Sequence, residues 1–219
     1  LSATGNMIGI LTQYSAANSD IAKNNNITIN TAAATTYGVQ TGTSAIGNIT
    51  GNTFSLTSSA VSANITAITA TTGTGPFNIS NNNIVSLNAS AAGSSAPIII
   101  GINSGIATAN TISGNTITGA VTGAGSGSAG ITGINIAAGT TTNVFKNKVY
   151  DLSASTTGTA TLISGIRIQA GTTNNIYNNY IGQGNALTGV NNADAVRAIN
   201  ITSTTASSTQ NIYYNTVYL

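Results

Sequence analysis

The chain has 219 residues, of which only 3 are acidic and 5 are basic, so charged residues make up 4% of it. This is far below the share of roughly 25% that is usual for soluble domains, whereas the apolar fraction of 41% is too high for a disordered chain. We therefore expect a folded protein. The lack of Cys excludes a disulfide framework and a thiolate metal site, and a net charge of +2 from five cations is no footprint for nucleic acid. No cofactor and no metal are predicted.

The longest apolar run reads APIIIGI, at residues 96 to 102, and it is far too short to cross a bilayer. Membrane insertion is therefore not expected. The lack of Cys is compatible with an exported bacterial protein. Because the chain starts at Leu1 without a signal-peptide pattern, we expect a segment of a longer repetitive protein.

In chain order, one phrase is written seven times. Its clearest copies are NVFKNKVYD at residues 143 to 151, NNIYNNYIG at 174 to 182 and NIYYNTVYL at 211 to 219. Aligned on one Asn, the copies are anchored at Asn25, Asn52, Asn82, Asn115, Asn147, Asn179 and Asn215, with spacings of 27, 30, 33, 32, 32 and 36 residues. The residue three before each anchor is apolar: Ala22, Ile49, Ile79, Ile112, Val144, Ile176 and Ile212. So is the residue two after it: Ile27, Phe54, Ile84, Ile117, Val149, Ile181 and Val217.

A second motif stands thirteen residues before the anchor in four copies, as Gly followed by Val39, Ile102, Ile134 or Ile166. We place Ile65 and Ile199 at the equivalent position of two further copies, 17 and 16 residues before their anchors. In three copies this Ile alternates with a second one, as in Ile134 and Ile136, which is typical of a strand with one face inward. Each repeat thus predicts a strand, a turn, a short strand, an Asn corner, a short strand and a variable loop.

A unit of about 30 residues cannot bury its apolar face alone, but stacked units can. Helices are not expected, because Asn, Thr, Ser, Gly and Ile dominate the composition. We predict an all-β, single-domain parallel β-helix over residues 1 to 219, with about seven coils of about 27 to 36 residues. The usual hand of parallel crossovers favours a right-handed coil.

The seven anchor Asn residues are predicted to form a structural ladder at one corner. The apolar positions before and after each anchor have opposite parity, so the chain must turn between them. Asn is the non-glycine residue that best tolerates the left-handed backbone of a tight corner. Stacked Asn side chains can also bond from coil to coil, as amide ladders do in cross-β structures.

The rows SGIRIQAGTTNNIYNNYIG and STTASSTQNIYYNTVYL resemble right-handed parallel β-helix repeats of very large secreted proteins of Bacteroidota and related bacteria. The resemblance extends from about Ile21 to the end of the chain. It implies a solenoid exported by the type IX route and displayed at the cell surface. It does not imply an activity, because such repeats occur in adhesins, filaments and proteins of other roles.

Parallel β-helices also include glycosidases and lyases, so we tested for catalytic residues. Glycoside hydrolysis requires two carboxyl groups roughly 5 to 10 Å apart. The three acids, Asp20, Asp151 and Asp194, fall at three different positions of the repeat, and the chain has no Glu. Lys146 and Lys148 precede Asp151, where we expect a solvated local ion pair. No catalytic residue is predicted, and the chain is expected not to be an enzyme.

Abundant Thr and low charge also raise ice binding as a minor alternative. A lattice-matching face requires Thr at one row in nearly every coil. The best row lies one residue after the anchor and reads Asn26, Thr53, Asn83, Thr116, Lys148, Tyr180 and Thr216. Only three of its seven members are Thr, so this row favours ordinary strand and turn composition.

Two outward rows remain as candidate ligand or assembly surfaces. An aromatic strip two residues before the anchor consists of Phe145, Tyr177 and Tyr213. It could bind sugar rings or another chain, or it could stiffen the solenoid as a cross-strand ladder, which we favour. An amide row one residue after the upstream Ile or Val reads Gln40, Asn103, Asn135, Arg167 and Asn200. It could bind a glycan, although bonding within the row is favoured.

These patterns predict a structural, non-enzymatic β-solenoid of the bacterial cell surface or of an extracellular filament, as a stalk, adhesin shaft or fibre subunit. The expected partners are further repeats or further copies of the chain, because an open coil recruits other strands. The main alternative is a carbohydrate-binding adhesin surface along the aromatic strip.

Overall fold

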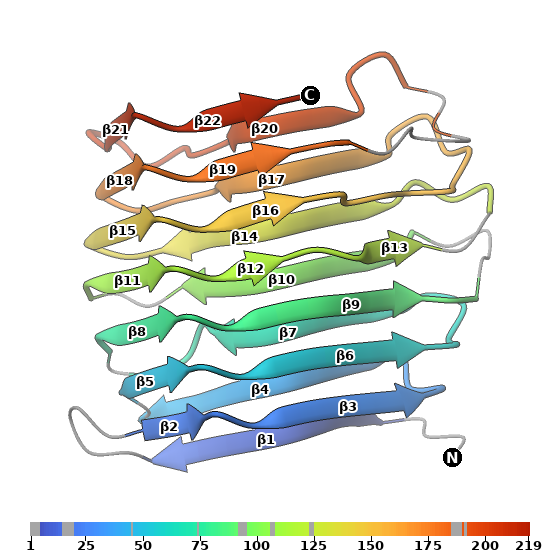
Figure 1. Ribbon diagram of the computed structural model, residues 1–219, viewed down its shortest axis with the longest axis horizontal. Coiled ribbons are helices and arrows are strands. Elements are labelled where there is room, and N and C mark those ends of the chain that lie inside the picture. Colours follow the sequence, from blue (N-terminus) through green and yellow to red (C-terminus); the bar gives the residue numbers. More distant parts are fainter. Residues whose placement is uncertain are drawn as a thin grey trace.

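A computed structural model describes residues 5–14, 20–44, 46–73, 75–91, 96–105, 108–122, 125–184, 190 and 192–219. These residues form 22 β-strands and no helix. The strands build three parallel sheets, each of which takes a strand from seven successive coils (Figure 1). The predicted all-β parallel solenoid is confirmed.

Sheet A contains β1 (Asn6–Tyr14), β4 (Thr35–Ser44), β7 (Asn64–Ala70), β10 (Ile98–Gly105), β14 (Gly130–Ala138), β17 (Leu162–Ile168) and β20 (Val196–Ile201). Sheet B contains β2 (Asp20–Lys23), β5 (Gly47–Thr50), β8 (Phe77–Ser80), β11 (Asn110–Ser113), β15 (Thr141–Phe145), β18 (Thr173–Tyr177) and β21 (Thr209–Tyr213). Sheet C contains β3 (Asn26–Thr31), β6 (Thr53–Ser58), β9 (Asn83–Ala89), β12 (Thr116–Ile117), β16 (Lys148–Tyr150), β19 (Tyr180–Gly182) and β22 (Thr216–Tyr218), and β13 (Ala120–Thr122) also pairs with β9.

The apolar rows on either side of the anchor lie in register through the whole stack. The row three before the anchor runs along sheet B, and the row two after it runs along sheet C. From the first coil to the sixth, the members of both rows are buried. The periodic Ile, Val and Phe positions therefore form one continuous core between the sheets, which no single coil could build.

The upstream row runs along sheet A, and one of its predicted members is wrong. In the third coil Ile68, and not Ile65, pairs with Val39 and with Ile102. Ile65 is also fully buried, so hydrophobicity alone does not distinguish the two positions. The prediction of Ile199 is confirmed, because this residue pairs with Ile166.

The Gly that precedes the upstream Ile allows sheet A to approach sheet C. A Cβ atom on Gly133 would lie 2.4 Å from Val149 Cγ1 and 2.6 Å from the Gly165 carbonyl oxygen. Both distances are shorter than a carbon atom tolerates. The Gly-Ile motif is therefore a packing feature, and it does not mark a turn.

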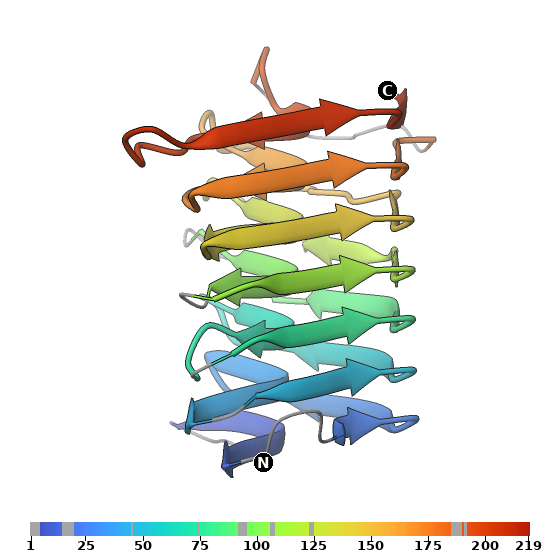
Figure 2. The same ribbon diagram turned by 90° about the vertical axis from the view of Figure 1, so that its left-hand side faces the viewer.

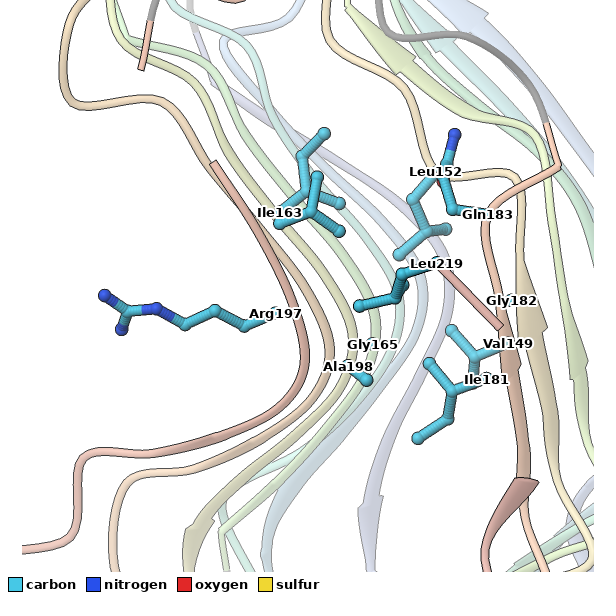
Figure 3. Close-up of a pocket in the computed structure, with 11 residues that line it drawn as sticks. Val149, Leu152, Ile163, Gly165, Ile181, Gly182, Gln183, Arg197, Ala198 and Leu219 are labelled. Carbon is cyan, nitrogen blue, oxygen red and sulfur yellow. The ribbon is translucent and has the colours of Figure 1, made fainter. Parts of the chain in front are cut away.

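The side chains between the sheets are tightly packed at the C-terminal coils. The space between Val149, Ile163, Ile181 and Leu219 has a volume of only about 10 Å³ (Figure 3). That is close to the smallest volume that holds one water molecule. The side chains around this space therefore fill it almost completely.

The two ends of the described chain lie at opposite ends of the stack (Figures 1 and 2). In the last coil the core rows are uncovered, so that Ile212 is 39% exposed and Val217 is 48% exposed. Their partners one coil below, Ile176 and Ile181, are buried. The end of the stack thus presents the same apolar rows that hold successive coils together.

Candidate functional site

The predicted Asn ladder runs without interruption through all seven coils, at the corner between sheets B and C. In each step the side-chain oxygen of one Asn accepts two bonds from the Asn of the preceding coil. For Asn115, the backbone N of Asn82 lies 3.0 Å away and its Nδ2 lies 2.9 Å away. The five inner members, from Asn52 to Asn179, are at most 2% exposed. The ladder thus replaces water at a corner that the fold buries.

From Asn52 to Asn215, each ladder amide also donates to the main chain. Asn115 Nδ2 donates to Asn147 Oδ1 at 2.9 Å, and it also lies 2.9 Å from the carbonyl oxygen of Ile79 in the preceding coil. The same pattern recurs along the ladder. A buried amide that loses such partners would cost about 1 to 3 kcal/mol for each unsatisfied group. The ladder therefore fixes the register of the coils.

The left-handed backbone expected at the ladder Asn occurs one residue earlier, and this part of the prediction is wrong. The residues with positive φ at the corner are Asn24, Gly51, Asn81, Gly114, Lys146, Asn178 and Tyr214, with values between 54° and 69°. This leaves the ladder Asn free to point inward. Asn and Gly occupy this conformation at little cost, whereas Lys146 and Tyr214 adopt it against their preference.

The aromatic strip is a stack of rings. The Phe145 and Tyr177 ring centroids are 5.1 Å apart with 7° between the planes, and Tyr177 and Tyr213 are 5.1 Å apart with 2° between the planes. Both faces of the Tyr177 ring are therefore covered by neighbouring rings. Only ring edges point sideways from this part of the strip, whereas a sugar stacks on a ring face.

The same row has a different character in the first four coils. Its members there are Lys23, Thr50, Ser80 and Ser113, in register with the strip. The aromatic stack is thus restricted to the last three coils. Tyr150 and Tyr180 belong to a separate edge-to-face pair on sheet C, with centroids 6.5 Å apart.

The amide row on the outside of sheet A is in register as predicted, with Thr69 as its member in the third coil. Bonding within the row is partial. Asn135 Nδ2 donates to Asn103 Oδ1 at 2.8 Å and to Gln169 Oε1 at 2.7 Å. Asn135 Oδ1 and Arg167 Nε are buried, and within the described chain they have no hydrogen-bond partner.

Sequence reasoning missed a second row of amides, on the outside of sheet B. Four residues before the anchor stand Asn48, Asn78, Thr111, Asn143, Asn175 and Asn211, which are in register. Asn175 Nδ2 donates to Asn143 Oδ1 at 2.8 Å, and Asn211 Nδ2 donates to Asn175 Oδ1 at 2.8 Å. The recurrence of Asn at this position is visible in the aligned repeats and could have identified the row.

Two ion pairs occur among the described residues, and both are exposed. Lys23 Nζ lies 3.0 Å from Asp20 Oδ2, and Arg197 pairs with both carboxylate oxygens of Asp194. The Arg197 hydrogen bond, with a smaller contribution from its charge, lowers the pKa of Asp194, and Asp194 raises the pKa of Arg197. Such surface pairs contribute little to stability.

The ion pair expected between Asp151 and Lys146 or Lys148 is not formed, although all three residues are described. Asp151 Oδ1 instead accepts a bond from the backbone N of Gly184 at 2.9 Å. The carboxylate is therefore directed along the stack to the next coil, where it binds a loop.

The three acids stand at three different positions of the repeat and in three different coils. Asp20 lies in the first coil, Asp151 follows β16 in the fifth and Asp194 precedes β20 in the seventh. Across the described part of the chain, no three Asp, Glu, His or Cys side chains gather as a metal site would require. In that same part there is also no helix able to traverse a bilayer.

The row considered for ice binding is in register on sheet C. Lys148 and Tyr180 interrupt it with long, exposed side chains.

Comparison with known proteins found no matching family model, no matching curated protein and no matching solved structure.

Proposed function

We propose that this chain is a structural, non-enzymatic shaft of the bacterial cell surface or of an extracellular filament. The observation that carries the proposal is the continuous inner ladder, in which every coil offers the next the same corner and the same core rows. Such a stack can be lengthened by one coil at a time without any new kind of contact. The bacterial surface location rests on the resemblance of the repeats.

The regular register of the core rows supplies a second argument. Each coil packs on the next through the same rows, so a further coil could be added in the same way, either from the same polypeptide or from a second copy. An identical copy added in this way would make a head-to-tail contact, which generates a filament. The low charge opposes neither this contact nor packing of shafts side by side.

In this role the aromatic strip stiffens the shaft. Stacked rings one coil apart resist both bending and slippage of the coils at this edge, because either motion would separate ring faces. A carbohydrate that stacked on Tyr177 would first have to displace Phe145 or Tyr213. The strip therefore favours the structural role over the adhesin alternative.

Electron microscopy of the native material tests the proposal. We expect rods or continuous fibres with an axial repeat of about 4.8 Å, the spacing of hydrogen-bonded strands. Val217→Lys places a charge in the uncovered row and should shorten fibres that are built from separate copies. Thr216→Lys, on the adjacent outward position of the same strand, is the matched control and should leave their length unchanged.

Compact particles without an axial strand repeat would contradict a shaft. So would a hydrolytic or lyase activity that is lost in Asp151→Asn or Lys148→Gln, because the proposal assigns no chemistry to these residues.

A further inference from the structure

The outer face of sheet A carries a hollow of about 310 Å³ that spans β10, β14 and β17. Figure 3 shows that the Arg197 side chain, on the neighbouring strand β20, points away from the core. The lining combines apolar Ile98 and Ile100 with polar Asn135, Arg167 and Gln169. Its volume lies at the lower end of the range of small-molecule sites, about 300 to 1,000 Å³.

Asn135 is the first sign that this hollow is a binding site. Its side chain is only 4% exposed, and both hydrogens of its amide are used by Asn103 and Gln169. Its Oδ1 has no partner among the described residues. A buried acceptor left in this way is costly unless a ligand or water supplies a donor.

Arg167, the next member of the same row, is the second sign. Its Nε is buried and has no partner in the described part of the chain, and the guanidinium forms no ion pair there. The carboxylate of Asp194 is engaged by Arg197 through both of its oxygens. The amide of Asn200, which is paired with Arg167 across the strands, is also engaged, by Arg197 and Ser164.

These groups define the ligand by its chemistry. Arg167 carries a positive charge that has no ion pair in the described part of the chain, and a guanidinium binds a planar carboxylate through two parallel bonds. Asn135 Oδ1 requires a hydroxyl or amide donor one coil away, at a distance of roughly 5 Å along the stack. Ile98, which is 47% exposed, and Ile100 offer an apolar surface beside them. A uronic acid carries all three features: a carboxylate, hydroxyl groups and an apolar ring face.

We propose that the hollow around Asn135 and Arg167 binds an acidic sugar unit of a polysaccharide. Arg167 holds its carboxylate, and the Asn135 side-chain oxygen accepts a hydrogen bond from one of its hydroxyl groups. The site is independent of the shaft role, because it uses the outer face of sheet A and leaves the ladder and the coil ends untouched.

Isothermal titration of the full chain with hexamers of galacturonate and of mannuronate tests the site. At least one hexamer should bind, and Arg167→Gln should weaken that binding by about 10-fold to 100-fold, as the loss of a charged hydrogen-bonding partner predicts. Arg167→Lys keeps the charge without the planar fork and should give an intermediate value. Lys148→Gln is the matched control, since it removes the same charge from an exposed position on sheet C, outside the lining of the hollow, and it should bind as the parent does.

Thermal unfolding separates this role from a structural one. Without sugar, Arg167→Gln should unfold at the temperature of the parent, because Arg167 has no partner to lose. With the bound hexamer present, the parent should gain stability and the variant should not.

Several outcomes would overturn the proposal. They are an absence of binding to both hexamers, equal binding of neutral maltohexaose or of hexaglutamate, an equal effect of Arg167→Gln and Lys148→Gln, and unfolding of Arg167→Gln and Arg167→Lys well below the parent temperature.

Discussion

The inside and the outside of the corner between sheets B and C follow different rules. Inside, Asn recurs in every coil and every amide bonds to the next. Outside, two residues before each ladder Asn, the row changes from small polar residues in the third and fourth coils to stacked rings in the last three. Burial explains the difference, because an unsatisfied amide is costly inside, whereas water satisfies any polar group outside.

The largest loss in the free energy of unfolding is expected when one ladder amide is removed. Asn115→Ala deprives Asn82 of its acceptor and leaves the Ile79 carbonyl without this donor. We expect a loss of at least about 3 kcal/mol in the free energy of unfolding, since several buried groups lose partners together. Urea denaturation measures it.

Asn143→Ala is the matched control for this prediction. Asn143 lies in the outer amide row, is partly exposed and accepts a bond from Asn175. The same substitution there should cost less than about 1 kcal/mol. Similar losses in the two variants would show that burial does not distinguish the ladder from the outer row.

The second-largest loss in the free energy of unfolding is expected in the aromatic stack. Tyr177→Ala removes the ring between Phe145 and Tyr213 and should cost about 1 to 3 kcal/mol, combining two ring contacts with lost apolar burial. Ser113→Ala, in the same row one coil before the stack, should be close to neutral. A double-mutant cycle between Phe145 and Tyr177 should give a coupling of about 0.5 to 1.5 kcal/mol, and a coupling of zero would mean that the rings are adjacent without stabilising one another.

A substitution at the left-handed corner residue should raise the free energy of unfolding. Lys146 has a φ of 56°, so Lys146→Gly should raise the free energy of unfolding by up to about 1 kcal/mol as it relieves the backbone. Lys148→Gly makes the same substitution within β16 and should lower stability, because Gly weakens a strand. The unfolding temperatures of both variants are compared with that of the parent. Destabilisation by both substitutions would refute a steric cost at Lys146.

The smallest effect is expected at the exposed pair of Asp194 and Arg197. The Arg197 hydrogen bond lowers the pKa of Asp194 below its ordinary value of 3.8. The contribution to stability is therefore present above pH 3.8 and is lost as the pH falls through the lower pKa of the folded state. The difference in unfolding temperature between the parent and Arg197→Gln should be small and should shrink from pH 5 to pH 2. A difference that stays constant with pH would contradict the pairing.

The ladder and the core could be predicted from sequence because they repeat. A buried position such as Asn115 or Ile112 meets the same surroundings in every coil, so its row stands out once the copies are aligned. Where a connecting turn changed in length, periodicity alone failed. Ile65 and Ile68 are equally buried, and only the strand pairing shows which one belongs to the row of Ile102.

Features that depend on pairwise contacts were harder to predict. The left-handed conformation belongs to the residue before the ladder Asn, which is Asn or Gly in five of the seven copies. This signal was overlooked, because Lys146 and Tyr214 interrupt it. The sequence also does not reveal that Asn135 Oδ1 and Arg167 Nε lack hydrogen-bond partners, because neighbouring side chains could have bonded to them. The orientation of the rings in the strip likewise required the coordinates.

Hydrogen exchange of the side-chain amides, followed by NMR, tests the central claim most directly. If the inner ladder ties the coils together, the Nδ2 protons of Asn82, Asn115 and Asn147 should exchange far more slowly than those of Asn143 and Asn175 in the outer row, because only opening of the corner exposes them. Exchange of the ladder protons at the rate of the outer row would contradict a buried, continuous ladder.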